Sequence, residues 1–310
     1  MVLNKFKAGS PTEEIIWIDI PIVDFAKEVS NYGIVCSVYI CKQLLQEYKL
    51  GKRKMKKTTT LKECKDRNKQ FENINELRER YDISDNPIIS IDLKKKELIG
   101  NFYRNGSCYC NKALNVYDHD FNTFSKGTIV PHGIYDLKQN IGYMTLSESK
   151  DTSEFSCDCI KYWWLNYGKK LYPNANSILI LCDGGGSNNA RGYLFKEYLQ
   201  KLVDEIGIEI RIAHYPPYTS KHNPIEHRLF PHVTRSLNGV LLDSIETMAD
   251  KIKNTTTSKG LKVIVNICNK IYESGKKATD NFKENCPIIF ENLLGKWNYT
   301  AVPQNREVIF

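Results

Sequence analysis

Two short apolar runs, each followed at once by an aspartate, constrain this chain most. Residues 87–91 lead into Asp92, and residues 177–182 lead into Asp183. Runs of this length, bounded by turn-forming residues, are typical of buried strands, so both aspartates are predicted at strand ends. Glu226 closes an Asn-Pro-Ile-Glu sequence that favours the start of a helix. Two strand ends and one helix start can meet over the edge of a sheet, and we expect the three carboxylates to lie together there.

Carboxylates gathered in one place repel one another unless cations lie between them. A pair of divalent metals between carboxylates is the usual device for in-line attack on a phosphodiester. Gly184, Gly185 and Gly186 follow the second aspartate and would let a nucleic-acid strand approach it closely. Spacing alone leaves two interpretations of Glu226 open, because a glutamate three residues after an asparagine N-cap also fits a capping box.

Other kinds of site fit the sequence less well. A strand, an acid and three glycines suggest a phosphate-binding turn, but the chain has neither a P-loop nor a clean G-x-G-x-x-G unit. The region also contains His214, His222, His227 and His232, yet no H-E-x-x-H of a zinc hydrolase. Ten cysteines without a regular framework predict reduced and mostly buried thiols. The C-x-C pairs at 108/110 and 157/159 lack the usual spacing of paired zinc ligands.

Strand-like and helix-like segments alternate after residue 86, which predicts an α/β fold. Expected strands cover residues 87–91, 97–103, 141–146, 177–182 and 208–212, and expected helices begin at Thr152, Tyr193, Asn223 and Ser244. Residues 105–133 are rich in Asn, Gly, Cys and Asp and are predicted to form a long loop or insertion. No stretch approaches the ~20 apolar residues of a membrane span, and the N-terminus lacks a signal core. We therefore expect no membrane association and a cytoplasmic location.

The N-terminal quarter carries most of the positive charge. Residues 1–70 contain 14 Lys and Arg against 8 Asp and Glu, in a chain of 310 residues with a net charge of +8. The densest part contains Lys52, Arg53, Lys54, Lys56 and Lys57, and a basic segment beside a structured unit suggests polyanion binding. Two helices are predicted, one after Pro21 and one from Ser37 to Tyr48, joined by a turn at Gly33. This pattern fits a DNA-binding helix-turn-helix, although any αα-hairpin looks the same.

Three blocks resemble one family, the Rhodopirellula-type DDE transposases of the ISAzo group of bacterial insertion sequences. They are residues 90–102, residues 183–188 and residues 223–230; further blocks at 133–137, 255–263 and 297–300 follow in the family's order. The resemblance covers roughly residues 55–302. It implies a ribonuclease-H-like mixed sheet flanked by helices, related to retroviral integrases, with a small all-α helix-turn-helix region before it. The implied divisions are a possibly shortened helix-turn-helix region (1–50), a basic linker and helix (51–85), a catalytic domain (86–302) and a tail (303–310).

The resemblance also implies an activity. Asp92, Asp183 and Glu226 would be the catalytic and metal-binding acids and would hold two Mg²⁺ ions, for which Mn²⁺ substitutes. The activity would be metal-dependent cleavage of double-stranded DNA at element ends and strand transfer into target DNA, by a homodimer or larger assembly at the bacterial nucleoid. The alternative is a catalytically silent DNA-binding remnant or repressor. Besides the basic segment already named, the predicted phosphate contacts are Lys94, Lys95, Lys96, Arg191, Lys221 and Arg228.

Overall fold

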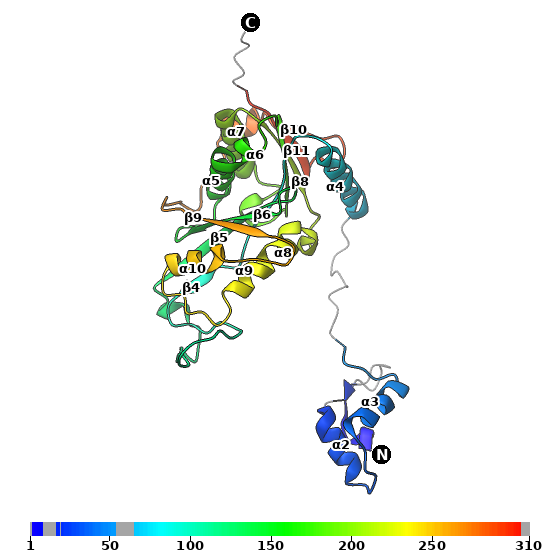
Figure 1. The fold of residues 1–310 in the computed structure, drawn as a ribbon. Coiled ribbons are helices and arrows are strands. Elements are labelled where there is room, and N and C mark those ends of the chain that lie inside the picture. The colour runs from blue at the N-terminus through cyan, green and yellow to red at the C-terminus, as the bar shows by residue number, and fades with distance from the viewer. Residues whose placement is uncertain (1, 9–16, 19, 54–64, 305–310) are drawn as a thin grey trace. The chain divides into compact units, whose positions relative to one another are not determined.

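The computed structural model describes residues 2–8, 17–18, 20–53 and 65–304. The chain divides into two compact units, residues 1–61 and residues 62–310 (Figure 1). The elements of the first unit are α1 (Val2–Lys5), β1 (Lys7–Ala8), β2 (Trp17–Ile18), α2 (Ile22–Ser30) and α3 (Val38–Glu47).

The first unit is built around α2 and α3. Phe25 and Ala26 of α2 pack against Cys36 and Cys41 in a small buried cluster. The predicted N-cap is present, since the Ser37 side chain accepts a hydrogen bond from the backbone N–H of Ile40 at 3.3 Å. The unit is not purely helical, because β1 and β2 form an antiparallel pair.

The connection between α2 and α3 is long for a helix-turn-helix. It runs from residue 31 to residue 37, seven residues, where the motif usually has three or four. DNA binding by this unit therefore stays a prediction.

The second unit contains one large sheet and most of the helices. Its elements are α4 (Arg67–Asp82), β3 (Ile88–Leu93), β4 (Glu97–Ile99), η1 (Asn122–Phe124), β5 (Gly127–Asp136), β6 (Ile141–Ser147), α5 (Ser153–Trp163), the π-turn η2 (Trp164–Gly168), α6 (Lys169–Leu171), β7 (Ser177–Cys182), η3 (Gly186–Asn188), α7 (Tyr193–Ile206), β8 (Glu209–His214), η4 (Ser220–His222), α8 (Pro224–Arg228), α9 (Phe230–Ser236), α10 (Ile245–Lys253), β9 (Lys262–Ile267), α11 (Asp280–Glu284), β10 (Ile289–Phe290) and β11 (Asn298–Ala301).

The sheet has the order β10-β11-β8-β7-β3-β5-β6-β9, with β4 paired to β5. Strand β5 is antiparallel to both of its neighbours, β3 and β6. On the other side of β3, strands β7 and β8 run parallel to it. This is a mixed sheet, as the resemblance implies. No helix in the described part of the chain has the length and apolar character that crossing a bilayer requires.

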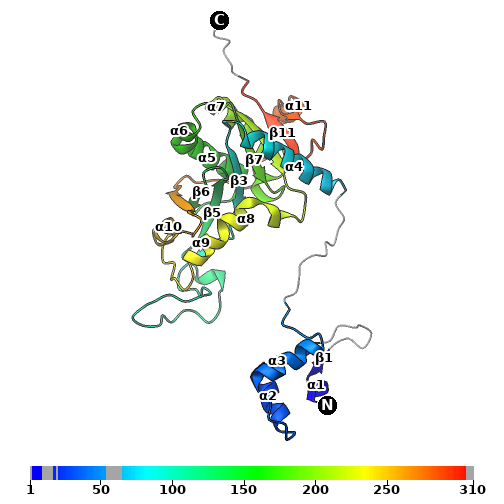
Figure 2. The ribbon, with the colours of Figure 1, turned by 45° about the vertical axis from the view of Figure 1, so that its right-hand side comes forward.

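Helices cover both faces of the sheet (Figure 2). On one face, α5 and α7 pack through Phe155, Phe195 and Leu199 onto a core that includes Ile180 and Ile210. On the other face, α8, α9 and α10 form a second core over β5 and β6, and α4 packs over β3, β7 and β8. The helix α4, predicted to belong to a linker region, is thus part of the larger unit.

The predicted loop over residues 105–133 is wrong at its C-terminal end, where β5 begins at Gly127. This strand contains Pro131 and Gly133, residues that ordinarily argue against a strand interior. Gly133 is required by packing, because a Cβ there would lie 2.6 Å from Phe230 Cε1. The strand predicted over residues 97–103 is also shorter, since Gly100 leaves β4 with φ +136°.

Candidate active site

The register of β3 and β7 brings the two aspartates to one edge of the sheet. Ser90 pairs with Leu181 in this parallel ladder, so Asp92 and Asp183 lie two residues further along, side by side. Asp92 is the fifth residue of β3 and also faces Gly133 of β5 across an antiparallel ladder. Asp183 follows the last residue of β7, where the three glycines begin.

A buried hydrogen-bond cluster attaches α8, the helix that carries Glu226, to the middle of β3. The Ser90 hydroxyl donates to Asn223 Oδ1 at 2.5 Å and accepts from the backbone N–H of Ile225 at 3.1 Å. Asn223 Nδ2 donates to the carbonyl oxygen of Ile91 at 3.2 Å. Ser90 and Asn223 are fully buried, so these bonds fix the first turn of α8 beside the strand that carries Asp92.

The capping-box interpretation of Glu226 is wrong. The side chain of Asn223 makes no cap hydrogen bond, because its oxygen accepts from Ser90. The backbone N–H of Asn223 donates to the carbonyl oxygen of Ser220 at 2.8 Å, which leaves no role for a glutamate reaching back to it. The Glu226 carboxylate is half-buried and is directed to other partners.

The pKa of Asp92 reflects its burial and the nearness of the other two acids. Burial, the charge of Asp183, and the charge and side-chain hydrogen bond of Glu226 together raise the pKa of Asp92 to about 8, and burial contributes most. The backbone N–H of Leu93, which donates to Asp92 Oδ1 at 2.7 Å, acts in the opposite direction. A carboxyl with a pKa this high is poorly stabilised as an anion, so the site favours a proton or another cation at Asp92.

The donor set fits a hard divalent cation. All three predicted ligands are carboxylates, and oxygen ligands suit Mg²⁺ and Mn²⁺ rather than zinc or copper. Within residues 2–8, 17–18, 20–53 and 65–304, no group of three or more Asp, Glu, His or Cys side chains lies close enough together to hold a metal ion. The fit therefore rests on the mutual repulsion at Asp92, which a cation placed among the carboxylates would relieve.

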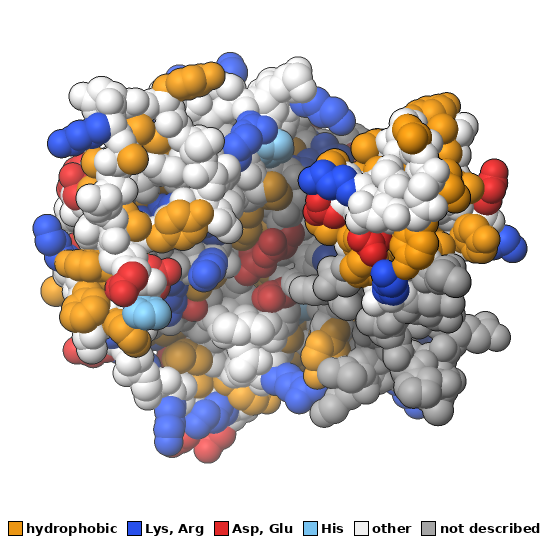
Figure 3. Space-filling view, turned by 90° about the horizontal axis from the view of Figure 1, so that it is seen from below, with side chains coloured by type: hydrophobic (Ala, Val, Ile, Leu, Met, Phe, Trp, Pro, Cys, Tyr) orange, Lys and Arg blue, Asp and Glu red, His pale blue; other side chains and the backbone are white. Residues whose placement is uncertain are grey.

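Most of the predicted phosphate contacts within the described residues are exposed. Acidic side chains gather in a hollow on the face of the larger unit shown in Figure 3, with Lys and Arg side chains around it. Among the predicted phosphate contacts, the exposed residues are Lys52, Arg53, Lys95, Lys96, Arg191, Lys221 and Arg228, while Lys54, Lys56 and Lys57 lie outside the described residues.

Lys94 is a correction to that set. It is only 6% exposed, and its ammonium group donates to Glu97 Oε1 at 2.8 Å. A buried ammonium that is already paired with a carboxylate is not available to a DNA phosphate, so Lys94 has a structural role.

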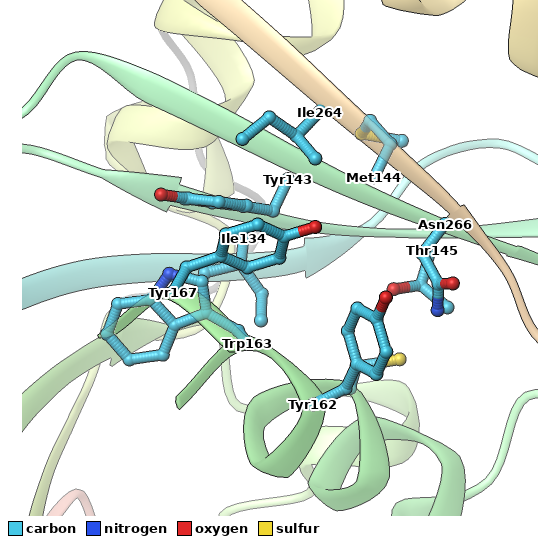
Figure 4. Close-up of a pocket in the computed structure, with 10 residues that line it drawn as sticks. Ile134, Tyr143, Met144, Thr145, Tyr162, Trp163, Tyr167, Ile264 and Asn266 are labelled. Atoms are coloured by element: carbon cyan, nitrogen blue, oxygen red, sulfur yellow. The ribbon is translucent and has the colours of Figure 1, made fainter. Parts of the chain in front are cut away.

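A second hollow lies between α5, the π-turn η2 and strands β6 and β9 (Figure 4). Its walls are mostly aromatic and aliphatic, with the Tyr143 and Tyr167 rings 5.0 Å apart between centroids. No acidic or basic side chain lines it. It lacks the carboxylates and basic side chains of a two-metal or phosphate site, and the candidate site remains at the sheet edge.

Sequence reasoning missed the residues that hold the acids in place. Ser90 acts on α8 from a position 133 residues before Asn223, and no local pattern marks such a pair. A polar residue inside the apolar run 87–91 is the only signal in the sequence. A buried polar group needs a hydrogen-bond partner, which could have pointed to Ser90 as an anchor.

Comparisons with known proteins give one family match and several similar solved structures. The profile described as "Rhodopirellula transposase DDE domain" matches residues 1–303, so the similarity begins well before the predicted residue 55. Among solved structures, the Mos1 transposase paired-end complex with left transposon end is similar at 16% identity and a TM-score of 0.42, over 74% of this chain and 64% of that chain. The mariner Mos1 paired end complex with Mg gives 14% identity and a TM-score of 0.45 over the same shares.

The chain thus spans 64% of the length of these Mos1 chains. A search of curated proteins finds no match. The profile match covers nearly the whole chain. The chain belongs to the Rhodopirellula transposase DDE domain family.

Proposed function

We propose that this protein is the transposase of a bacterial insertion sequence, which cleaves DNA at the element ends and transfers the strand ends into target DNA. The observation that supports the proposal is the placement of Asp92 and Asp183 at neighbouring strand ends, with both Asp183 and Glu226 near enough to raise the pKa of Asp92. The family membership supports the same activity.

Each acid is positioned by a different part of the fold. Asp92 is held on a central strand of the sheet, Asp183 begins the glycine-rich segment after β7, and Glu226 is fixed by the hydrogen bonds of Ser90 to the first turn of α8. Together they would hold two Mg²⁺ ions, or Mn²⁺ in their place. When bound, such ions would activate the attacking water or DNA 3′-hydroxyl and stabilise the leaving oxygen.

DNA is the proposed partner in two forms, the terminal repeats of the element and the target duplex. Exposed basic side chains, among them Lys221 shortly before α8 and Arg228 at its end, would contact its phosphates. Because transposition must bring two element ends together, we propose a homodimer or larger assembly on DNA. Its place of action would be the nucleoid in the bacterial cytoplasm.

The test is metal-dependent nicking of a plasmid that carries the DNA flanking the coding region. We expect nicking with Mg²⁺ or Mn²⁺, and loss of nicking in each of Asp92→Asn, Asp183→Asn and Glu226→Gln, because a two-metal site fails when one ligand loses its charge. All three variants should fold, as shown by circular dichroism. A wild-type protein that binds this DNA but never nicks it would support the silent repressor instead.

A further inference from the structure

The carbonyl oxygen of Asp183 is held by a buried imidazole. His214, the last residue of β8, pairs with Cys182 in the parallel ladder, and its Nδ1 lies 2.8 Å from the Asp183 carbonyl oxygen. His214 is fully buried. A carbonyl oxygen can only accept, so Nδ1 carries the proton and donates it. The Cys182 sulfur also lies 3.3 Å from Nδ1 and is a weaker acceptor.

The tautomer of His214 is set by a second residue. With the proton on Nδ1, the neutral ring presents Nε2 as an acceptor, and the Tyr299 hydroxyl lies 2.8 Å from Nε2 and donates to it. Tyr299 is fully buried in β11. The bonds thus form a directed chain, from the Tyr299 hydroxyl to the His214 ring and from the ring to the backbone of Asp183.

The same group of residues holds the far end of the segment that Asp183 begins. Lys196 is 3% exposed and donates to the carbonyl oxygens of Ala190 at 2.6 Å and Gly192 at 3.2 Å. Its ammonium group lies 4.8 Å from the centroid of the Tyr299 ring, a cation–π contact. Residues 183–192 are therefore bonded at one end to His214 and at the other end to Lys196, and both of these side chains contact Tyr299.

The middle of the segment is held separately by α5, where Ser153 donates to the Ser187 carbonyl oxygen at 2.7 Å and Ser156 donates to Asn188 Oδ1 at 2.8 Å. Three glycines follow Asp183, and glycine has the largest choice of backbone conformations. The Asp183 carbonyl lies beyond the last ladder pair of β7 and β8, so no strand bond orients its peptide plane. The bond from His214 orients that peptide plane, and the Asp183 carboxylate accepts from the backbone N–H of Gly185 at 3.2 Å through Oδ1.

We propose that His214 and Tyr299 are positioning residues for Asp183 and set the metal affinity of the site without touching the metal. The inference rests on the proposed function, in which Asp183 is a metal ligand. Groups that orient a ligand typically contribute about 10- to 100-fold to metal affinity.

The experiment measures Mn²⁺ binding to the full chain without DNA, from the electron paramagnetic resonance signal of free Mn²⁺. We expect His214→Leu, which cannot donate, to weaken binding by about 10- to 100-fold and Tyr299→Phe by about 10-fold. His214→Asn should keep most of the affinity, because its amide nitrogen can take the place of Nδ1.

Tyr172→Phe is the matched control. It also removes a buried hydroxyl, one that donates to both oxygens of Asp136 at 2.8 and 2.9 Å, and it should leave Mn²⁺ affinity unchanged even if it lowers stability. Wild-type affinity in folded His214→Leu and Tyr299→Phe would overturn the inference; if His214→Leu does not fold, Tyr299→Phe alone decides. Wild-type affinity in Asp183→Asn would instead overturn the proposed metal site, and this inference with it.

Discussion

Asp92 differs from an ordinary surface aspartate in two physical respects. It is partly buried on a central strand, and two further acids lie near it, so both desolvation and repulsion raise its pKa, to about 8 against an ordinary 3.8. An arrangement that destabilises an anion lowers the stability of the fold unless a cation is bound. Such unfavourable local electrostatics are typical of functional sites.

Asp92 should make the metal-free protein less stable as the pH rises. Because its folded pKa lies above its ordinary value, the folded state keeps a proton that the unfolded chain has lost between about pH 4 and pH 8. The stabilisation is thus complete below pH 4 and is lost as the pH rises through 8. With a chelator present, Asp92→Asn should gain stability over wild type between pH 5 and pH 8.5, by about 1 kcal/mol or more, roughly 2–4 °C in Tm.

Thermal unfolding at both pH values measures this gain. The control is Asp280→Asn, whose carboxylate is 90% exposed and pairs with Lys283; because this lysine keeps its charge from pH 5 to pH 8.5, the effect of the change should not depend on pH. A constant difference between Asp92→Asn and wild type at the two pH values would contradict the account of Asp92.

Ser90→Ala tests the anchor of α8. The change leaves the backbone N–H of Ile225 and the Asn223 side chain without their buried partner, which costs about 1–3 kcal/mol. Urea unfolding should show this loss, together with slower nicking. Ser84→Ala, which removes a half-buried bond to the Tyr81 carbonyl, should cost less; equal stability of Ser90→Ala and wild type would remove Ser90 from this role.

Among the elements, α8 shows how closely the helix carrying Glu226 must approach the sheet. Its neighbours on the sheet include Gly133 of β5, where an added Cβ would lie 2.6 Å from Phe230 Cε1 and 2.8 Å from Ile225 Cδ1. Only a glycine leaves room for the helix at this distance. The position of Glu226 thus depends on a residue in another strand, 93 positions earlier in the chain.

Gly133→Ala should therefore displace α8. The overpacking is expected to cost about 1–3 kcal/mol and to reduce nicking more than it reduces DNA binding. Gly192→Ala is the matched control, because its Cβ would meet nothing closer than 3.5 Å. If both variants unfold at the same urea concentration, the close approach of α8 to β5 is not a constraint.

The sequence allowed most elements to be predicted, and the failures have physical reasons. The apolar runs before Asp92 and Asp183 predicted β3 and β7, and Thr152 and Ser244 cap their helices as expected. Strand β5 was hidden by Pro131 and its glycines, of which Gly133 is required by packing against Phe230, a residue far away in the sequence. The contacts that orient the acids, such as that of Ser90 with Asn223, join residues far apart in sequence, and local periodicity does not report them.

At the scale of the whole molecule, the charge of the N-terminal quarter suggests a second route of DNA contact. Affinity for DNA should fall with salt, with a log–log slope of about −0.9 for each phosphate neutralised. Neutralising Lys52, Arg53, Lys54, Lys56 and Lys57 to Gln should flatten this slope and leave Mn²⁺ binding unchanged. Fluorescence anisotropy at several salt concentrations measures it.

A variant with five other lysines changed to Gln provides the comparison. Each of these is paired with a carboxylate on the larger unit: Lys161, Lys201, Lys253, Lys276 and Lys283. It should keep a slope close to that of wild type. A slope that stays the same in the first variant would exclude the basic segment from the DNA interface.

The meeting of Asp92, Asp183 and Glu226 around divalent metal is the central claim, and anomalous diffraction from crystals grown with Mn²⁺ tests it most directly. The account predicts anomalous peaks between these three carboxylates, about 3.5–4 Å apart if both ions are bound, and their loss in Asp183→Asn crystals. Strong peaks elsewhere in the molecule, with none at this sheet edge, would contradict it.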